Sequence, residues 1–112
     1  MSDRSLWEIL VPTVRNDSGK PYRLRYHRVW DEKVRAVSNG LTIMPVAKGQ
    51  WVNPTDGKLF SERMIPVRVL ATREEIEKIV DLTIKYYEQE AVLAYRVADE
   101  VILKYREDKK EQ

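Results

Sequence analysis

The sequence predicts an α+β fold in which two helices cover one face of an antiparallel sheet. Two segments repeat apolar residues at helical spacing, and four others are rich in apolar and β-branched residues. Clusters of turn-forming residues separate these segments in the order strand, helix, strand, strand, helix, strand. This order, βαββαβ, is that of the ferredoxin-like fold, which has a four-stranded sheet.

Composition limits what the chain can be. Its 112 residues, 43% of them hydrophobic, can bury one core, so we predict one domain over 1–105 and a charged tail over 106–112. Lys and Arg total 20 against 18 Asp and Glu, a balance too even to indicate nucleic-acid binding by itself. There is no cysteine, which excludes disulfides, thiolate metal sites and a thiol nucleophile.

The first strand and the first helix have different apolar patterns. Leu6 to Val14 is apolar on both parities, as in a central strand covered on both faces. The turn formers of 16–21 end it. From Leu24 onward apolar residues recur every three or four positions, and Asn39-Gly40 stops this helix because both residues tolerate the left-handed conformation.

A hairpin follows the first helix. Its first strand runs from Leu41 to Val46 and resumes at Trp51-Val52, and Pro45 requires an edge position or a bulge. Pro54 to Gly57 forms the turn, and Leu59 to Leu70 forms the third strand. Pro66 lacks a backbone donor, so we expect a bulge there as well.

The second helix begins at a capping box made by Thr72 and Glu75. After it, Ala91 to Val97 predicts the fourth strand, and Val101 to Leu103 continues it as a bend or as a second short strand.

One face of such a sheet has no helix over it, yet the first and third strands are apolar on both parities. Each exposed Val, Leu or Ile forgoes roughly 1.5–3 kcal/mol of burial energy. We therefore predict a homo-oligomer that packs these faces together, a homotrimer first and a homodimer second.

The candidate site combines a carboxylate with aromatic rings. Glu62 lies near the open face with Trp51 across the hairpin, a pairing that suits a small cation. Glu62 could instead be a surface residue or a partner of Arg63 or Arg68. For Trp51 and the tyrosines at the exit of the second helix, packing is the alternative role.

Two further features allow more than one interpretation. The stretch from Arg15 to Arg35 is locally basic and is either a solvated helix face or a site for an anion. His27, the one histidine, lies on the apolar stripe of the first helix and is either a core residue or a ligand contact. A lone histidine without cysteines offers no metal site, so we expect none.

Two runs of this sequence resemble the phage-encoded S-adenosylmethionine-degrading enzymes, now regarded as lyases. They are Trp51 followed eleven positions later by Glu62 on a strand, and Tyr87-Glu-Gln-Glu-Ala-Val-Leu-Ala-Tyr95 at the end of a helix. The helix with Tyr26-His27-Arg28 matches more loosely. The outline GLT…GQW…QEAVL also resembles a family of uncharacterised small bacterial proteins.

The lyase resemblance implies a PII-like trimer that binds its ligand between subunits. It implies a reaction in which the substrate's own carboxylate attacks its γ-carbon, giving homoserine lactone and 5′-methylthioadenosine without a cofactor. Glu62 and Trp51 then correspond to the catalytic pair, and Gln89, Glu90, His27 and Arg28 to substrate contacts. The lyases have a tyrosine where this chain has Trp51, a difference that bears on turnover.

Three functions follow as hypotheses. The first is a lyase-like phage protein acting on S-adenosylmethionine. The second is a non-catalytic PII-like trimer that binds a nucleotide-like ligand or a protein. The third, a nucleic-acid binder using the basic stretch, is the least expected, because the third strand lacks the paired aromatics of an RNA-recognition sheet. Without a signal pattern or a long apolar run, we expect a cytoplasmic protein, in the host cytoplasm if phage-encoded, with no membrane partner.

Overall fold

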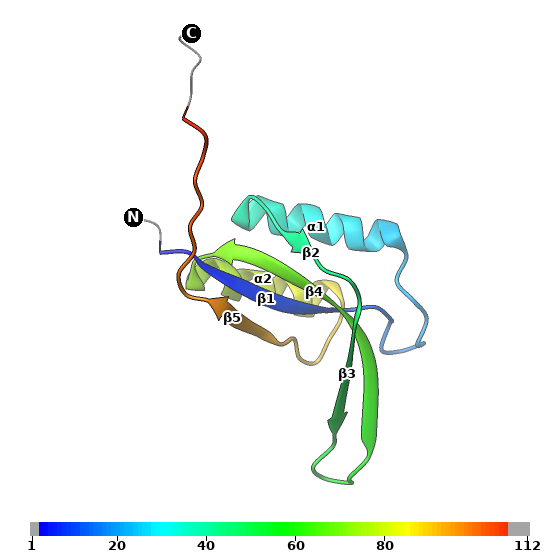
Figure 1. The fold of residues 1–112 in the computed structure, drawn as a ribbon. Coiled ribbons are helices and arrows are strands. Elements are labelled where there is room, and N and C mark those ends of the chain that lie inside the picture. Colours follow the sequence, from blue (N-terminus) through cyan, green and yellow to red (C-terminus); the bar gives the residue numbers. More distant parts are fainter. Residues whose placement is uncertain (1–2, 108–112) are drawn as a thin grey trace.

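The structure is a computed structural model that describes residues 3–107. Its elements confirm the predicted α+β, ferredoxin-like order, with the second predicted strand divided in two. They are β1 (Ser5–Pro12), α1 (Leu24–Ser38), β2 (Thr42–Ile43), β3 (Ala47–Val52), β4 (Leu59–Ala71), α2 (Arg73–Tyr86) and β5 (Ala94–Ala98). All strand pairs are antiparallel, in the order β2-β4-β1-β5, with β3 also paired to β4 (Figure 1).

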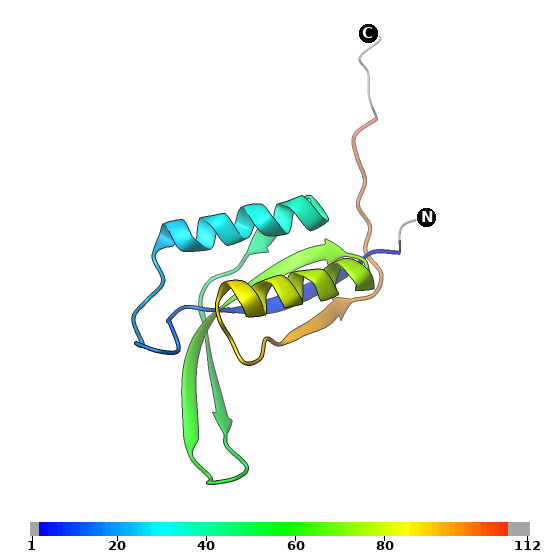
Figure 2. The same cartoon turned by 180° about the vertical axis from the view of Figure 1, so that it is seen from behind.

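Both helices lie on one side of the sheet, and the core fills the space between them (Figure 2). From the sheet, alternate residues of β1 and β4 point into this core, because side chains alternate along a strand. The buried hydrophobic residues of the strands are Ile9, Val11, Val67, Val69 and Ala71. The indole N–H of Trp30 on α1 donates to Thr83 Oγ1 on α2 at 3.0 Å, and this bond ties the two buried helix faces together.

The helix boundaries follow from the predicted caps. α1 ends at Asn39, which has the left-handed φ of 74°, and its N–H donates to Arg35 O. At the start of α2, Thr72 Oγ1 accepts from the Glu75 N–H at 3.0 Å while Glu75 Oε1 accepts from the Thr72 N–H at 2.9 Å. Both predicted signals are confirmed, since each acts through its own local backbone.

Pro45 and Pro66 are both accommodated by one irregularity, a break in the edge strand. The predicted bulge at Pro66 in the third strand is wrong, because β4 keeps an unbroken register with β1 from Met64 to Ala71. The Pro66 carbonyl accepts from the Met44 N–H, so the donorless side of Pro66 faces the edge. There the strand breaks between β2 and β3, at the segment that contains Pro45.

The last strand is shorter than the sequence predicts. β5 covers only 94–98, so the predicted start at Ala91 and the extension over Val101 to Leu103 are both wrong. Ala98 already pairs with Leu6, near the beginning of β1, so residues beyond it have no strand to pair with. Of the predicted tail, residues 106–107 have no regular structure, and 108–112 lie outside the described residues.

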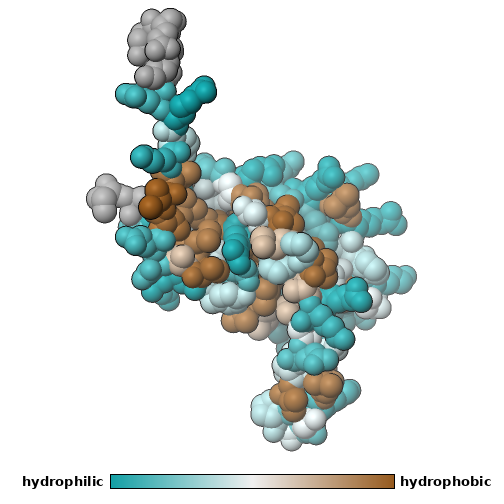
Figure 3. All heavy atoms as spheres, in the orientation of Figure 1, coloured by the Kyte–Doolittle hydropathy of each residue, from teal (hydrophilic) through white to brown (hydrophobic). Residues whose placement is uncertain are grey.

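The β3–β4 hairpin projects from the body of the molecule (Figure 1). The opposite side of the sheet from the helices has no element of the described chain over it (Figures 1 and 2). Figure 3 shows this open face as hydrophobic residues around a hydrophilic strip. The fold therefore leaves the open face and the hairpin uncovered by any other described element.

Candidate functional site

The projecting hairpin presents a flat aromatic pair beside a carboxylate. The rings of Trp51 and Phe60, which face each other across β3 and β4, stack at 4.5 Å between centroids and 15° between planes. Glu62 lies two residues beyond Phe60 and therefore on the same side of the hairpin, opposite Gly49. Gly49 has no side chain, and the Met64 side chain lies over it, with its Cε 3.1 Å from where a Cβ of residue 49 would stand.

The structure thus brings together Trp51 and Glu62, as the sequence predicts. Trp51 is 46% exposed, and Glu62 is exposed without a hydrogen bond or ion pair to any residue within 3–107. Neither alternative partner takes it, because Arg68 pairs with Glu8 instead. A free carboxylate beside two stacked rings is suited to a cationic ligand.

This side of the hairpin continues into the open face of the sheet. Even-numbered residues of β4 share one face, and they lead from Phe60 and Glu62 on the hairpin to Arg68 and Leu70 on the sheet. The odd-numbered residues of the same strand carry Val67 into the core. The hairpin group and the open face therefore form one continuous surface of the subunit.

A polar group that sequence reasoning missed lies in the middle of the open face. The Arg68 guanidinium donates to Glu8 Oε1 at 2.9 Å, and the Tyr95 hydroxyl donates to Glu8 Oε2. Glu8 lies opposite Arg68 in β1–β4 pairing and opposite Tyr95 in β1–β5 pairing. Opposite charges at paired positions of a predicted antiparallel register are the signal that could have found this group.

These contacts change the acidity of the group. The hydrogen bond from Tyr95 and then that from Arg68 hold the pKa of Glu8 below its usual value, and they outweigh its burial. The same bond to Glu8 raises the pKa of Tyr95. Glu8 is therefore a carboxylate at neutral pH and is neutralised by its partners, so the open face carries a satisfied ion pair.

The remaining predicted residues lie on α1 and around the exit of α2, near the end of the sheet from which the hairpin projects (Figure 1). His27 Nδ1 lies 2.6 Å from the hydroxyl of buried Tyr87, and the Gln89 side chain donates to Tyr87 O at 3.0 Å. Burial lowers the pKa of His27, so this ring is neutral at neutral pH, which agrees with a core role. Arg28 points away, on the exposed side of α1.

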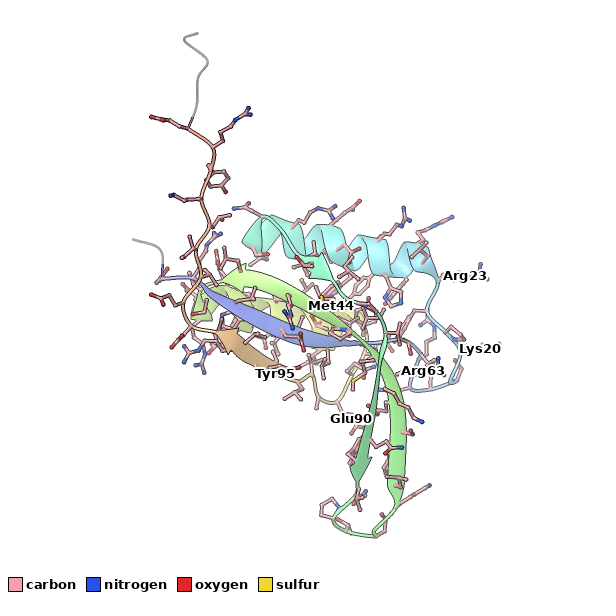
Figure 4. All side chains as sticks on the ribbon, in the orientation of Figure 1. Lys20, Arg23, Met44, Arg63, Glu90 and Tyr95 are labelled. Carbon is pink, nitrogen blue, oxygen red and sulfur yellow. The ribbon has the colours of Figure 1, made fainter. Side chains whose placement is uncertain are left out.

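Glu90 follows this exit (Figure 4) and lines a small hollow of about 270 Å³. Arg15, Asp17 and Glu88 also line this hollow. Among residues 3–107, no hydrogen bond, ion pair or ring contact joins this helix-exit group to Trp51 or Glu62. Within one chain the predicted site residues therefore form two groups.

In the described part of the chain, no three His, Cys, Asp or Glu side chains are placed to hold a metal ion. No described helix is both long and apolar enough to cross a membrane.

Comparison with known proteins finds similar folds but no similar sequence family. No protein-family model and no curated protein matches the sequence. Among solved structures, a phage S-adenosylmethionine lyase in complex with S-methyl-5′-thioadenosine matches with a TM-score of 0.65 at 12% identity, over 88% of this chain and 84% of that one. The chain thus has an α+β, ferredoxin-like architecture shared with this lyase.

A second group of solved structures shares the architecture equally well. The CutA protein of Xylella fastidiosa matches with a TM-score of 0.66 at 14% identity, covering 91% of this chain and 88% of that chain. The periplasmic divalent cation tolerance protein CutA of Archaeoglobus fulgidus matches with a TM-score of 0.60 at 12% identity, covering 96% and 90%. The resemblance to phage S-adenosylmethionine lyases, based on two short runs of sequence, therefore extends to the whole fold.

Proposed function

We propose that this protein binds S-adenosylmethionine between copies of the chain and cleaves it to homoserine lactone and 5′-methylthioadenosine. The observation that carries the proposal is the free carboxylate of Glu62 beside the Trp51–Phe60 ring pair, on a chain with the fold of a phage S-adenosylmethionine lyase. The spacing of Trp51 and Glu62 is also the lyase-like run of the sequence.

The hairpin group suits the charges of this substrate. S-Adenosylmethionine carries a sulfonium, an ammonium and a carboxylate, together with a flat adenine. Aromatic ring faces attract a sulfonium and stack with adenine, and a carboxylate pairs with an ammonium. We assign Glu62 to the ammonium and the two rings to the adenosyl end.

The reaction needs little from the protein beyond these contacts. The substrate carboxylate oxygen forms a bond to Cγ as the bond from Cγ to sulfur breaks, and the sulfur keeps the electron pair and becomes a neutral thioether. No water, proton or cofactor enters the balance. Attacking and leaving groups belong to one molecule, so holding it in a folded shape supplies most of the rate increase.

Charge disappears along this path, because the carboxylate and the sulfonium neutralise each other. A site shielded from water therefore favours the transition state over the charged ground state. The ammonium keeps its charge throughout, so pairing Glu62 with it does not oppose the step. The rings of Trp51 and Phe60 supply the apolar wall.

We propose that a second copy completes the site, in a homotrimer, with a homodimer as the second choice. The hairpin projects beyond its own sheet, so one chain leaves Glu62 in solvent (Figure 1). Packing open faces together would bury the hydrophobic residues of Figure 3 and bring the hairpin against a neighbour. Gln89 and Glu90 of that neighbour are the proposed opposite wall, whereas the core position of His27 and the outward direction of Arg28 argue against substrate contacts from these two.

A second candidate function is binding without turnover, of a nucleotide-like ligand or a protein. The observation that favours it is Trp51 itself, because the indole has no hydroxyl where the lyases have a phenol. Recognition of adenine or sulfonium by the ring survives this difference, whereas a hydrogen bond from the phenol does not.

The test is incubation of the purified protein with S-adenosylmethionine, followed by mass spectrometry of the products and by calorimetry of binding. The proposal predicts methylthioadenosine and homoserine lactone in equal amounts. Saturable binding with intact ligand would instead establish the second candidate. Absence of both would overturn the assignment of this ligand.

Glu62→Gln tests the site separately from the reaction. We expect kcat/KM to fall at least about a hundredfold, because the neutral amide cannot pair with the ammonium. Glu32→Gln, the same chemical change at an exposed position of α1, is the matched control and should retain full activity. Equal activities of the two variants would show that the chemistry lies elsewhere.

A further inference from the structure

A second concave surface lies at the start of α1. It is a groove of about 990 Å³ where the segment between β1 and α1 meets the end of α2. Its lining residues are Arg15, Lys20, Pro21, Arg23, Leu24, Arg25, Tyr26, Val29 and Tyr86. This volume is typical of sites for small molecules.

All the charged side chains that line the groove are positive. Four of its lining residues are cationic and none is acidic. None of the four makes an ion pair with any residue in 3–107, whereas Arg4, Arg68 and Arg73 all do. Lys20 and Arg23 lie on the segment that leads into α1 (Figure 4).

The tyrosines at the bottom of the groove form a rigid wall. Tyr26 stacks on Tyr22 at 4.9 Å and on Tyr86 at 4.2 Å, so both faces of its ring are covered. The hydroxyls of Tyr26 and Tyr86 donate to each other's backbone carbonyls. These rings therefore have no free donor, and Tyr26 has no free face, with which to bind a ligand.

The rings of Tyr22 and Tyr26 instead hold the guanidinium of Arg15 in place. The Arg15 guanidinium carbon lies 4.7 Å from the centroid of Tyr22 and 5.3 Å from that of Tyr26. Such contacts hold the guanidinium plane while leaving its N–H groups available. On its other side Arg15 lines the small hollow with Asp17, Glu88 and Glu90, so it stands at the boundary between an acidic and a basic surface.

The start of α1 adds to this positive potential. Arg23 at its N-cap makes no side-chain cap, and the first turn has no acidic residue. The first amide groups of a helix attract negative charge. Leu24 and Arg25 of this turn line the groove.

We propose that this groove binds a small molecule carrying two or more phosphate groups. Guanidinium groups match phosphate oxygens in pairs, and four unneutralised cations require a ligand with several negative charges. The groove is separate from the hairpin group of the proposed S-adenosylmethionine site, whose cationic ligand the groove would repel. The ligand class includes inorganic polyphosphates and nucleoside polyphosphates, which share this chemistry.

The experiment is isothermal titration calorimetry with inorganic triphosphate and with ATP at an ionic strength of about 0.15 M, where exposed charges are screened beyond roughly 8 Å. We expect saturable binding of both. A similar affinity for the two would assign recognition to the phosphates alone, and tighter binding of ATP would add a contact to the nucleoside.

The variant pair Arg23→Gln with Arg25→Gln tests the location. It should weaken triphosphate binding about tenfold or more, because two charge-assisted contacts are lost. Arg35→Gln with Lys78→Gln removes the same charge from exposed positions outside the groove and should weaken binding less than about twofold. Thermal melting of all variants checks that the fold is retained.

Three results would overturn the proposal. They are no binding of either phosphate compound, equal weakening by the two variant pairs, and a single-stranded oligonucleotide that binds far more tightly than triphosphate through the same arginines. The last result would assign the groove to nucleic acid.

Discussion

Glu8 and Glu62 are two carboxylates on one continuous surface with opposite surroundings. Glu8 has a 12% exposed side chain and accepts from Arg68 and Tyr95, whereas Glu62 is exposed and has no partner among the described residues. A buried carboxylate with satisfied oxygens stabilises a fold, and a free one beside aromatic rings is available to a ligand. The two residues therefore have separate roles, the first structural and the second in recognition.

The Glu8 group predicts how stability responds to pH. The pKa of Glu8 is lower in the folded chain than in the unfolded one, so its contribution is complete above the unfolded value of about 4.5 and is lost as pH falls through the folded value. We expect Glu8→Gln to reduce the unfolding free energy by about 2 kcal/mol at pH 7 and by much less in acid.

Urea unfolding at neutral and acidic pH, at one protein concentration, checks this prediction. Tyr95→Phe is the companion variant, since it removes one donor and keeps the ring. The unfolding free energy of Tyr95→Phe should depend less on pH than that of the wild type. A difference between Glu8→Gln and wild type that stayed constant with pH would contradict the assigned role.

At the scale of single residues, local pattern suggests Glu62 and Trp51, whereas Glu8 can be found only from a predicted register of the whole sheet. The hairpin turn fixes which residues of β3 and β4 face each other, so the ring pair and the carboxylate follow from local pattern. The partners of Glu8 are about 60 and 87 positions away along the chain. Only the register of three strands brings them together.

Among the elements, α2 is the one whose start the sequence defines most directly. Thr72 and Glu75 satisfy each other's backbone amides, so the cap acts within four residues. Thr72→Ala should lower the unfolding free energy by about 1 kcal/mol. Thr72→Ser keeps the hydroxyl and should restore most of it, as measured by thermal or urea unfolding. Equal losses in the two variants would show that the cap is not what stabilises this end.

The elements that the sequence misplaced depend on neighbours instead of local signals. Pro66 lies in β4 without a bulge because its donorless side faces the edge, where β2 ends and β3 has not begun. β5 stops at Ala98, whose partner Leu6 is one residue from the beginning of β1. The β propensity of one segment does not predict either feature, because both depend on where the partner strand ends.

At the scale of the whole molecule, the open face and the hairpin are what the fold leaves unpartnered. The helices bury one parity of β1 and β4, and the other parity carries Leu6, Leu10, Met64 and Leu70 around the Glu8 group. A surface of this kind is typical of an interface between subunits. The order of elements alone predicted this uncovered face, since two helices can cover only one side of the sheet.

Leu10→Glu tests whether this face is the contact surface. It places an unpaired charge where we propose that two copies meet, so it should dissociate the oligomer. Leu24→Glu, at a 65% exposed position on α1, is the matched control and should leave the assembly intact. Dissociation by both variants, or by neither, would place the contact elsewhere. Sedimentation velocity of the two proteins provides the comparison.

The central claim is that copies of the chain meet through their open faces and so build a ligand site around Glu62. Sedimentation equilibrium of the wild-type protein tests it most directly. We predict a species of three times the 13.2 kDa chain mass, and a species of twice that mass would keep the shared face but change its symmetry. A single 13.2 kDa species at every concentration, with and without S-adenosylmethionine, would contradict the claim.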